Sequence, residues 1–410
     1  MTRVPYPIEL VRQQFPALRR TSNGKPVAYF DGPGGSQVVG TCIDAMADYM
    51  RQGGANLHGQ FASSLETEAH ILEAKQAMAD LLNVDPSEVA FGANATTLLF
   101  HVARALSRDW KPGDEIVVTE LDHRGNVDPW ITLAQDIGVT IRWIKVDTET
   151  FTLDLSELDS LINAKTKLVA VGLASNAVGT INEVAMVSAR AKQVGALVAV
   201  DAVQAVPHFS VDFQALGADI LTCSAYKFFG PHIGIVAIRA ELFKKLDVYK
   251  LLPAPSHAPD KLETGTLNHE GIAGIRPAVE FIAALGTGTT RRERIISGYE
   301  RMEAHENRLA EKLRTALSAL PKIKLYQAPP EVRKTPTVAL TVEGMTPSEV
   351  CKQVIDASSV FIADGNFYAW TLAEKLGINP SGAWVRAGLS PYNSEEEVDR
   401  FINAMARLVR

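Results

Sequence analysis

Short apolar runs separated by helical stretches constrain the fold of this chain more than any other feature of its sequence. They lie at residues 89–91, 115–119, 140–144, 168–173, 197–200 and 220–223. Strands that are apolar on both faces and alternate with helices are typical of a mostly parallel sheet covered on both sides. The sequence therefore predicts an α/β fold. A further run at 234–238 follows residue 223 too closely for a crossover helix, so we expect it to be an antiparallel strand of the sheet.

The segments on either side predict the rest of the organisation. We first expect a short helix over 8–18, a brief strand over 28–30 and a glycine-rich turn over 31–35 that leads into a helix. A longer helix is expected over 66–82. The pattern beyond residue 271 is helical to about residue 320, with a charged, solvated helix face over 291–314. Short strands (337–341, 384–387) and helices (347–355, 394–408) then follow. We predict an N-terminal segment (1–27) that packs with the small domain, a large domain (28–285) and a small α+β domain (286–410).

The composition excludes some classes of function. The 410 residues carry 41 Lys and Arg against 47 Asp and Glu, a net charge of −6, and no run rich in Lys and Arg. Nucleic acids and anionic membranes bind clustered positive charge, so neither is an expected partner and small-molecule chemistry is favoured.

Cysteine usage and hydropathy indicate where the protein works. The three cysteines, Cys42, Cys223 and Cys351, are too few and too scattered for a disulfide framework or a metal cluster, and they suit a reducing, cytoplasmic setting. The N-terminus has no apolar signal segment, and no run of about 18 apolar residues occurs. A soluble, unexported protein without a metal site is expected.

Polar residues that follow the apolar runs are the first site candidates, because ligands of open α/β sheets bind at the carboxyl ends of strands. Asp201 ends the run at 197–200, although a helix cap or a loop carboxylate would also explain it. Lys227 follows the run at 220–223 and is flanked by apolar residues, which is unfavourable unless something neutralises it. It is either a surface lysine on a turn or an amine bound as a Schiff base to a carbonyl cofactor.

Two more turns have the composition of a ligand site. The strand at 89–91 is followed by Gly92-Ala93-Asn94-Ala95-Thr96-Thr97, where small residues, hydroxyls and free N–H groups at a helix start suit a phosphate. A plain N-cap explains one Thr but not the small residues, and the chain has no nucleotide-binding glycine motif. After 115–119, His123 could stack on a flat heteroaromatic ring, although a solvated loop histidine is the simpler alternative.

These turns belong to a series of segments that match one family in order and spacing from about residue 28 to 400. The segments are Ala28-Tyr29-Phe30-Asp31, Asn94-Ala95-Thr96-Thr97, Asp122-His123-Arg124-Gly125-Asn126, Ala174-Ser175-Asn176-Ala177-Val178-Gly179-Thr180, Val200-Asp201-Ala202-Val203-Gln204-Ala205-Val206-Pro207-His208, Ser224-Ala225-Tyr226-Lys227 with Gly230-Pro231, Glu263-Thr264-Gly265-Thr266 and Trp384-Val385-Arg386. The chain resembles the class V, fold-type I pyridoxal 5'-phosphate (PLP) enzymes, and within them the cysteine desulfurase and selenocysteine lyase branch. The resemblance implies a large domain with a mostly parallel sheet of the seven-stranded type and a smaller C-terminal domain.

The resemblance also implies how the cofactor ring would be held. Lys227 would bind PLP covalently and later move protons, and Asp201 would pair with the protonated pyridine nitrogen. Gln204 would contact the ring's phenolic oxygen, while His123 would stack on the ring face.

The phosphate and the substrate have implied partners as well. The phosphate would be held by Ala95, Thr96, Ser224 and Tyr226, and by Thr266 from the partner subunit of a homodimer. The substrate, a small amino acid, would bind its carboxylate to Arg386 in a bidentate pair, with Asn176 beside the ring and the substrate.

Departures from the family pattern bear on the reaction. Desulfurases carry a nucleophilic Cys on a loop of the small domain, and Tyr368 stands at the matching position here, where it cannot accept sulfur. Cys351 and Cys223 are expected to be buried and inert. Tyr226 also replaces the usual His before the lysine, and Gly32-Pro33-Gly34-Gly35 replaces the usual Asn-Ala-Ala-Thr. Persulfide chemistry is therefore not expected.

The sequence predicts a PLP enzyme that acts at the α-carbon of an amino acid. A lyase on a sulfur-containing or related amino acid ranks first because of the branch that the chain resembles, followed by an aminotransferase and an epimerase. All three reactions share the removal of the α-proton by Lys227. Tyr368 is a candidate catalytic residue as a proton donor, or else a lid that only packs. A non-catalytic PLP-binding protein and a nicotinamide-dependent dehydrogenase are the alternatives, and the latter lacks the dinucleotide glycine fingerprint.

Overall fold

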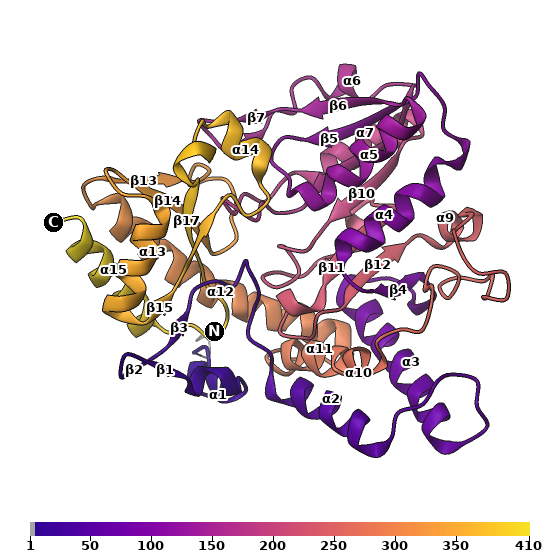
Figure 1. Cartoon of the computed structure of the whole chain (residues 1–410), viewed down its shortest axis with the longest axis horizontal. Coiled ribbons are helices and arrows are strands. Elements are labelled where there is room, and N and C mark those ends of the chain that lie inside the picture. Colours follow the sequence, from indigo (N-terminus) through magenta and orange to yellow (C-terminus); the bar gives the residue numbers. More distant parts are fainter. Residues whose placement is uncertain (1–4) are drawn as a thin grey trace.

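A seven-stranded sheet forms the centre of the computed structural model, which describes residues 5–410 (Figure 1). Strand β12 runs antiparallel to both of its neighbours, and the pairs among β11, β10, β9, β5 and β6 are parallel, as the sequence predicted. The strands, in their order across the sheet, are β4 (Val89–Gly92), β12 (Gly234–Ile238), β11 (Ile220–Ser224), β10 (Leu197–Asp201), β9 (Thr166–Gly172), β5 (Glu115–Thr119) and β6 (Thr140–Ile144).

Helices cover both faces of this sheet. Side chains alternate between the faces along each strand, so Val117 packs with one set of helices while its neighbours Ile116 and Val118 pack with the other. The first face is covered by α3 (Ala62–Leu82), α7 (Val184–Val194) and α11 (Ile275–Ala284), and the second by α4 (Ala95–Leu106), α5 (Asp128–Ile137) and α9 (Ala240–Lys245).

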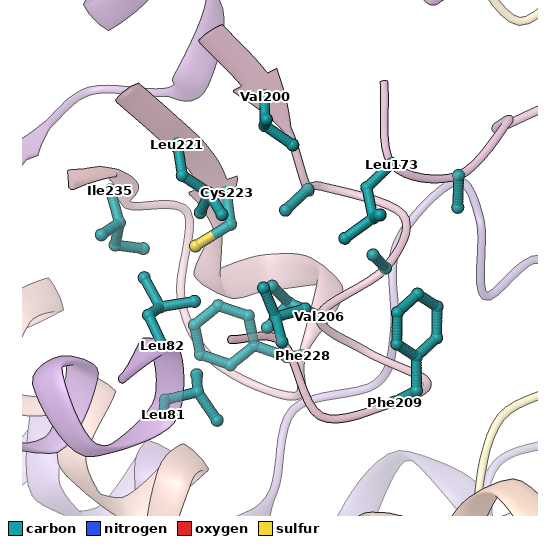
Figure 2. Close-up of a cluster of buried hydrophobic side chains, with 14 of the residues drawn as sticks. Leu81, Leu82, Leu173, Val200, Val206, Phe209, Leu221, Cys223, Phe228 and Ile235 are labelled. Carbon is teal, nitrogen blue, oxygen red and sulfur yellow. The ribbon is translucent and has the colours of Figure 1, made fainter. Parts of the chain in front are cut away.

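The carboxyl ends of the parallel strands rest on a dry apolar cluster. Figure 2 shows Cys223 of β11 among buried apolar side chains that include Leu82, Leu221 and Phe228. Such packing fixes the strand ends, and therefore the turns that follow them, in one arrangement.

The C-terminal part of the chain builds a second, smaller core beside the sheet (Figure 1). Its antiparallel sheet has the order β13 (Ile323–Tyr326), β14 (Thr337–Val342), β17 (Trp384–Gly388) and β16 (Ala363–Gly365). Its helices are α12 (Arg291–Ser318), α13 (Pro347–Ser358), α14 (Trp370–Lys375) and α15 (Glu395–Leu408). One side of the charged helix α12 is buried, with Leu309 and Leu313 in this core, so only its other side is the solvated face that the sequence predicted.

The N-terminal residues contact the C-terminal part. Arg12 of α1 (Ile8–Gln13) donates to Glu397 of α15 at 2.8 Å, and β3 (Ala28–Tyr29) pairs in parallel with β15 (Val360–Phe361). The domain boundaries at 27/28 and 285/286 stay predictions, and residues 1–4 of the predicted N-terminal segment lie outside the described residues.

The remaining elements are short or connect the larger ones. A 3-10 turn at Pro16–Arg19 replaces the end of the helix predicted over 8–18, because Pro16 cannot donate to a continuing helix. The others are α2 (Gly40–Gln52), α6 (Leu158–Leu161), α8 (Phe213–Leu216), α10 (His269–Ala273), β1 (Thr21–Ser22), β2 (Lys25–Pro26), β7 (Val146–Asp147) and β8 (Thr152–Leu153). Across residues 5–410, the helices are all too short or too polar to cross a bilayer.

Candidate active site

A cavity of about 690 Å³ opens where the parallel strands end, and we call it the inner cavity. Turns that follow β4, β5, β9, β10 and β11 form its floor, and Arg386 of β17 with the loop before α14 closes it from the C-terminal side. The predicted site residues that line it are Ala95, Thr96, His123, Asn176, Asp201, Gln204, Ser224, Tyr226, Lys227, Tyr368 and Arg386. Thr266 does not line it and is exposed on a separate loop.

Lys227 is buried at the centre of this cavity. It ends the short turn Ala225–Lys227 that follows β11, and its Nζ donates to the carbonyl oxygen of Pro33. Burial, together with the nearby Arg386 guanidinium, lowers the pKa of Lys227 to about 7, against the opposing pull of Asp31 and Asp201. A large fraction of this amine is therefore neutral, and able to act as a nucleophile or a base, near neutral pH.

Two carboxyl groups line the same cavity as the lysine. Asp201, the last residue of β10, accepts from Val203 N at 2.8 Å, and burial raises its pKa to about 6 although Lys227 favours the charged form. Asp122 follows β5, and burial raises its pKa to about 7. It accepts from Gly172 N and from Asn126 Nδ2, each at 2.8 Å.

Asp122 lies in one of the segments that resemble the family, but no role was predicted for it. It follows a buried strand of the parallel sheet, as Asp201 ends one, and this position was the available signal. Gly172 makes room for it, since a Cβ there would lie 2.8 Å from Asp122 Oδ1. The floor of the cavity thus contains two carboxyl groups, and a role was predicted for Asp201 alone.

His123 forms one wall of the cavity in its neutral state. Its Nδ1 accepts from Gly125 N at 2.9 Å, so the ring proton sits on Nε2. Burial, Lys227 and Arg386 all disfavour the imidazolium and lower the pKa of His123 to about 4. The imidazole is consequently an uncharged flat surface, and its centroid lies 5.2 Å from that of the Tyr368 ring.

The N-terminus of α4 supplies free backbone donors to the same cavity. Asn94 caps the helix by accepting from Thr97 N at 2.8 Å, and the amides of Ala95 and Thr96 begin the first turn, where helical N–H groups have no partner within the helix. Gly234 of β12 allows this close approach, because a Cβ there would lie 2.3 Å from the carbonyl carbon of Asn94. This arrangement fits an anion such as a phosphate.

Arg386 lies on the opposite side, buried at 3% exposure. Its Nη1 donates to the Asn176 carbonyl at 3.0 Å and its Nη2 to Asp31 Oδ1 at 3.1 Å, while the Phe367 ring centroid lies 3.6 Å from the guanidinium carbon. Within residues 5–410, Arg386 Nε and Asn176 Oδ1 are buried without a hydrogen-bond partner. Buried polar atoms of this kind are usually satisfied, so these two are suited to a polar ligand.

Several contacts among the residues that line the inner cavity were not predicted from the sequence. Gln204 Nε2 and Lys227 both donate to the carbonyl oxygen of Pro33, in the turn that departs from the family pattern. Tyr226, which stands where the family has His, stacks on His232 with centroids 4.7 Å apart and planes inclined by 8°. Asp31 and Phe367, neither of which was predicted to belong to the site, both contact Arg386.

The loop that carries Tyr368 has an unusual backbone. Phe367 and Tyr368 have φ values of +53° and +60°, a region that residues with a Cβ rarely adopt. Asn176 Nδ2 donates to the Phe367 carbonyl at 2.6 Å and Arg124 N donates to the Tyr368 carbonyl at 2.8 Å. These bonds hold the loop over the cavity and leave the Tyr368 side chain 70% exposed.

None of the three cysteines is among the residues that line the inner cavity in the described chain. All are buried, and burial raises the pKa of Cys42 and of Cys351 to about 12. The pKa of Cys223 is raised further still, again by burial. Thiols held in this protonated state are poor nucleophiles.

Comparison with known proteins agrees with this geometry. The family Aminotransferase class-V matches residues 28–401. A cysteine desulfurase of Serratia proteamaculans is 32% identical over 419 residues and an aminotransferase-like protein of Gibberella zeae is 32% identical over 415, covering 98% and 99% of this chain and the same shares of theirs. The apo structure of a cysteine desulfurase from Thermococcus onnurineus superimposes with a TM-score of 0.87 at 31% identity, covering 100% of this chain and 99% of that one.

The family match, the near-complete coverage and the shared architecture agree on the fold and on the kind of enzyme. Class V aminotransferases and cysteine desulfurases depend on PLP. The lysine, the carboxylates, the helix N-terminus and the buried arginine of the inner cavity fit that group. The chain therefore belongs to the class V aminotransferase family.

Proposed function

We propose that the chain binds PLP through Lys227 and acts at the α-carbon of an amino acid, as a lyase on a sulfur-containing or related substrate. The supporting observation is that the Lys227 amine, with its pKa near 7, faces the same cavity as the Asp201 carboxyl, the neutral His123 ring and Arg386. The other wall residues have the chemistry that the remaining parts of the cofactor need.

PLP, when bound, withdraws electrons from the substrate α-carbon so that a bond to it can break. The protein residues would hold it as follows. Asp201 would keep the pyridine nitrogen protonated, His123 would cover one ring face, and Gln204 would bind the phenolic oxygen. The phosphate would bind at the first turn of α4, at Ala95 and Thr96, with Ser224 and Tyr226.

The substrate would be oriented by the opposite wall. Its carboxylate would bind Arg386, whose Nε has no other partner among the described residues, and Asn176 would lie beside it. Lys227 lines the same cavity and would remove the α-hydrogen as a base. The Cβ–S bond would then break, the sulfur would leave as a thiol with the proton that Lys227 had removed, and one water would convert the released enamine into pyruvate and ammonia.

Product analysis of the holoenzyme tests this function. Amino acids are screened for a change in the cofactor absorbance, and the products of each responding substrate are then identified. A thiol and pyruvate support the lyase, whereas an amino-group exchange or inversion of the α-carbon would instead show an aminotransferase or an epimerase. Unchanged spectra with all amino acids would indicate a non-catalytic PLP-binding protein.

We expect cysteine to give no protein-bound persulfide. The residue at the loop position is Tyr368, and the thiols of Cys223 and Cys351 are buried and protonated. The measurement is mass spectrometry of the alkylated protein after incubation with cysteine, with assay of alanine in the supernatant. Release of alanine at a catalytic rate together with persulfide on either cysteine would overturn this prediction.

Tyr368→Phe separates two roles of the loop. If the phenol relays a proton to or from the substrate, kcat should fall about 10²-fold, in the range of general acid–base effects, while KM changes little. If Tyr368 only packs, both constants should stay close to those of the wild type. The matched control is Tyr249→Phe, which removes a hydroxyl from a similarly exposed tyrosine (54%) outside the cavity.

We also propose a cytoplasmic homodimer in which Thr266 reaches the phosphate of the partner's site. Thr266 is exposed, and its loop is fixed from inside by Glu263, which accepts from Phe91 N at 2.9 Å and from Lys75 Nζ at 3.1 Å. Such anchoring would hold a contact made to another subunit. Sedimentation analysis should give twice the chain mass, and a monomer that retains full activity would contradict the role of Thr266.

A further inference from the structure

A second hollow of about 670 Å³ adjoins the mouth of the inner cavity, and we call it the outer hollow. Arg124, Asp128 and Tyr368 line both spaces, so a ligand can extend from one into the other past Tyr368. The residues that line only the outer hollow are Trp143, Asn366, Trp370, Thr371 and Glu374.

Three aromatic side chains, those of Trp143, Tyr368 and Trp370, line this hollow. Trp370 is 50% exposed and Tyr368 70% exposed, although large aromatic rings are normally buried. The carbonyl of Trp370 accepts from Asn379 Nδ2 at 3.3 Å. Trp143 lies on β6, the edge strand of the large sheet. The backbone positions from which these two tryptophan rings project are therefore fixed by the fold.

The guanidinium of the outer hollow is already paired, so the aromatic side chains are its main feature for binding a ligand. Arg124 forms an ion pair with Asp128 and donates to Thr371 Oγ1 at 3.2 Å, so the guanidinium already has its partners. Flat rings bind other flat rings by stacking and edge contacts. Glu374 adds one carboxylate, and a cationic ligand is accordingly the alternative that the experiment must separate.

We propose that the outer hollow binds an aromatic group on the side chain of the amino-acid substrate, whose amine and carboxylate lie in the inner cavity. The inference rests on the proposed function and narrows it. Among sulfur-containing amino acids, it favours cysteine conjugates whose sulfur carries an aromatic group over those with a small substituent.

A matched pair of ligands without an amine tests binding separately from turnover. Benzylthiopropanoate and methylthiopropanoate share the carboxylate and the sulfur and differ in the aromatic ring. Calorimetry with the holoenzyme should show the benzyl compound binding about tenfold tighter or more, as expected when an apolar ring leaves water. Turnover of S-benzylcysteine and S-methylcysteine should show the same preference in kcat/KM.

Substitution of an aromatic residue of the outer hollow tests whether this hollow causes the preference for the benzyl compound. Trp370→Ala should reduce the preference for the benzyl compound to near parity while the affinity for the methyl compound stays the same. Met186→Ala is the matched control, because it truncates a large side chain of similar exposure (55%) that lines a separate hollow on α7. This control should keep the full preference.

The two proposals fail in different ways. Equal affinity for both ligands in the wild type, or an unchanged preference in Trp370→Ala, overturns the aromatic subsite even if S-methylcysteine is turned over. If 5-aminopentanoate, whose terminal ammonium group represents a cationic ligand, binds more tightly than benzylthiopropanoate, the aromatic subsite is overturned in favour of a cationic one. If no amino acid is turned over, the proposed function fails, and the ligand comparison still decides the outer hollow.

Discussion

Lys227→Ala should fold, keep its oligomeric state and lose all covalently trapped cofactor. The side chain ends a short turn and makes one hydrogen bond, to the Pro33 carbonyl, so its removal leaves the strand and the cluster beneath it intact. After PLP and borohydride treatment, digestion and mass spectrometry should find the phosphopyridoxyl adduct on Lys227 of the wild type. Turnover should fall by several orders of magnitude, since the same amine is the proposed base.

Lys261→Ala is the control for this variant. Lys261 is also buried, and its Nζ donates to the Leu246 carbonyl at 2.8 Å outside the inner cavity. It should keep both the adduct and the activity. An adduct on any lysine other than Lys227 in the wild type would refute the assignment of the site.

The depressed pKa of Lys227 adds a signature in the apoprotein. The folded-state pKa of Lys227, about 7, lies below the ordinary lysine value of 10.5, so between these values Lys227 binds more protons in the unfolded chain than in the folded one. The contribution of Lys227 to the stability of the apoprotein should therefore rise as the pH increases from about 7 toward 10. This part of the pH dependence should be missing in Lys227→Ala, as thermal unfolding across that range would show.

The sequence was sufficient for the centre of the sheet because its inner strands are buried on both faces. A strand of this kind appears as a continuous apolar run, and the run at 115–119 has the same bounds as β5. The run at 140–144 also matches β6, although that edge strand is buried only at Ile144. The antiparallel strand was also predictable, since the ten residues between 223 and 234 are too few for a crossover helix. Short edge elements such as β13 and β16 gave no such signal, because exposed positions interrupt their apolar pattern.

The site was predictable where polar residues follow buried strands, and less so where the small domain contributes. Lys227 and Asp201 belong to sequence-local turns at one sheet edge. The pairing of Asp31 with Arg386, by contrast, joins residues separated by 355 positions, and the left-handed backbone at Phe367 follows from tertiary bonds rather than from a local glycine. The aromatic wall of the outer hollow likewise forms only when β6 and the loop before α14 meet.

Asp201→Asn should leave PLP attached through Lys227 but reduce turnover about 10²- to 10³-fold. The amide keeps an oxygen for the Val203 N–H and removes only the charge that would stabilise a protonated pyridine nitrogen. Breaking a buried charge pair costs about 3–5 kcal/mol, so the ring would lose its proton and with it the capacity to withdraw electrons. The measurement is kcat together with the stoichiometry of the borohydride-trapped adduct.

Two further variants show whether the Asp201 effect is specific. Asp219→Asn changes a carboxylate that also accepts from a backbone amide at the large sheet, Val198 N at 2.9 Å, but outside the inner cavity, and should leave kcat unchanged. Asp122→Asn should lower kcat less than Asp201→Asn, because Asp122 already receives bonds from Gly172 and Asn126. Near-normal turnover of Asp201→Asn would show that Asp201 does not bind the ring nitrogen. A larger loss in Asp122→Asn than in Asp201→Asn would assign that role to Asp122.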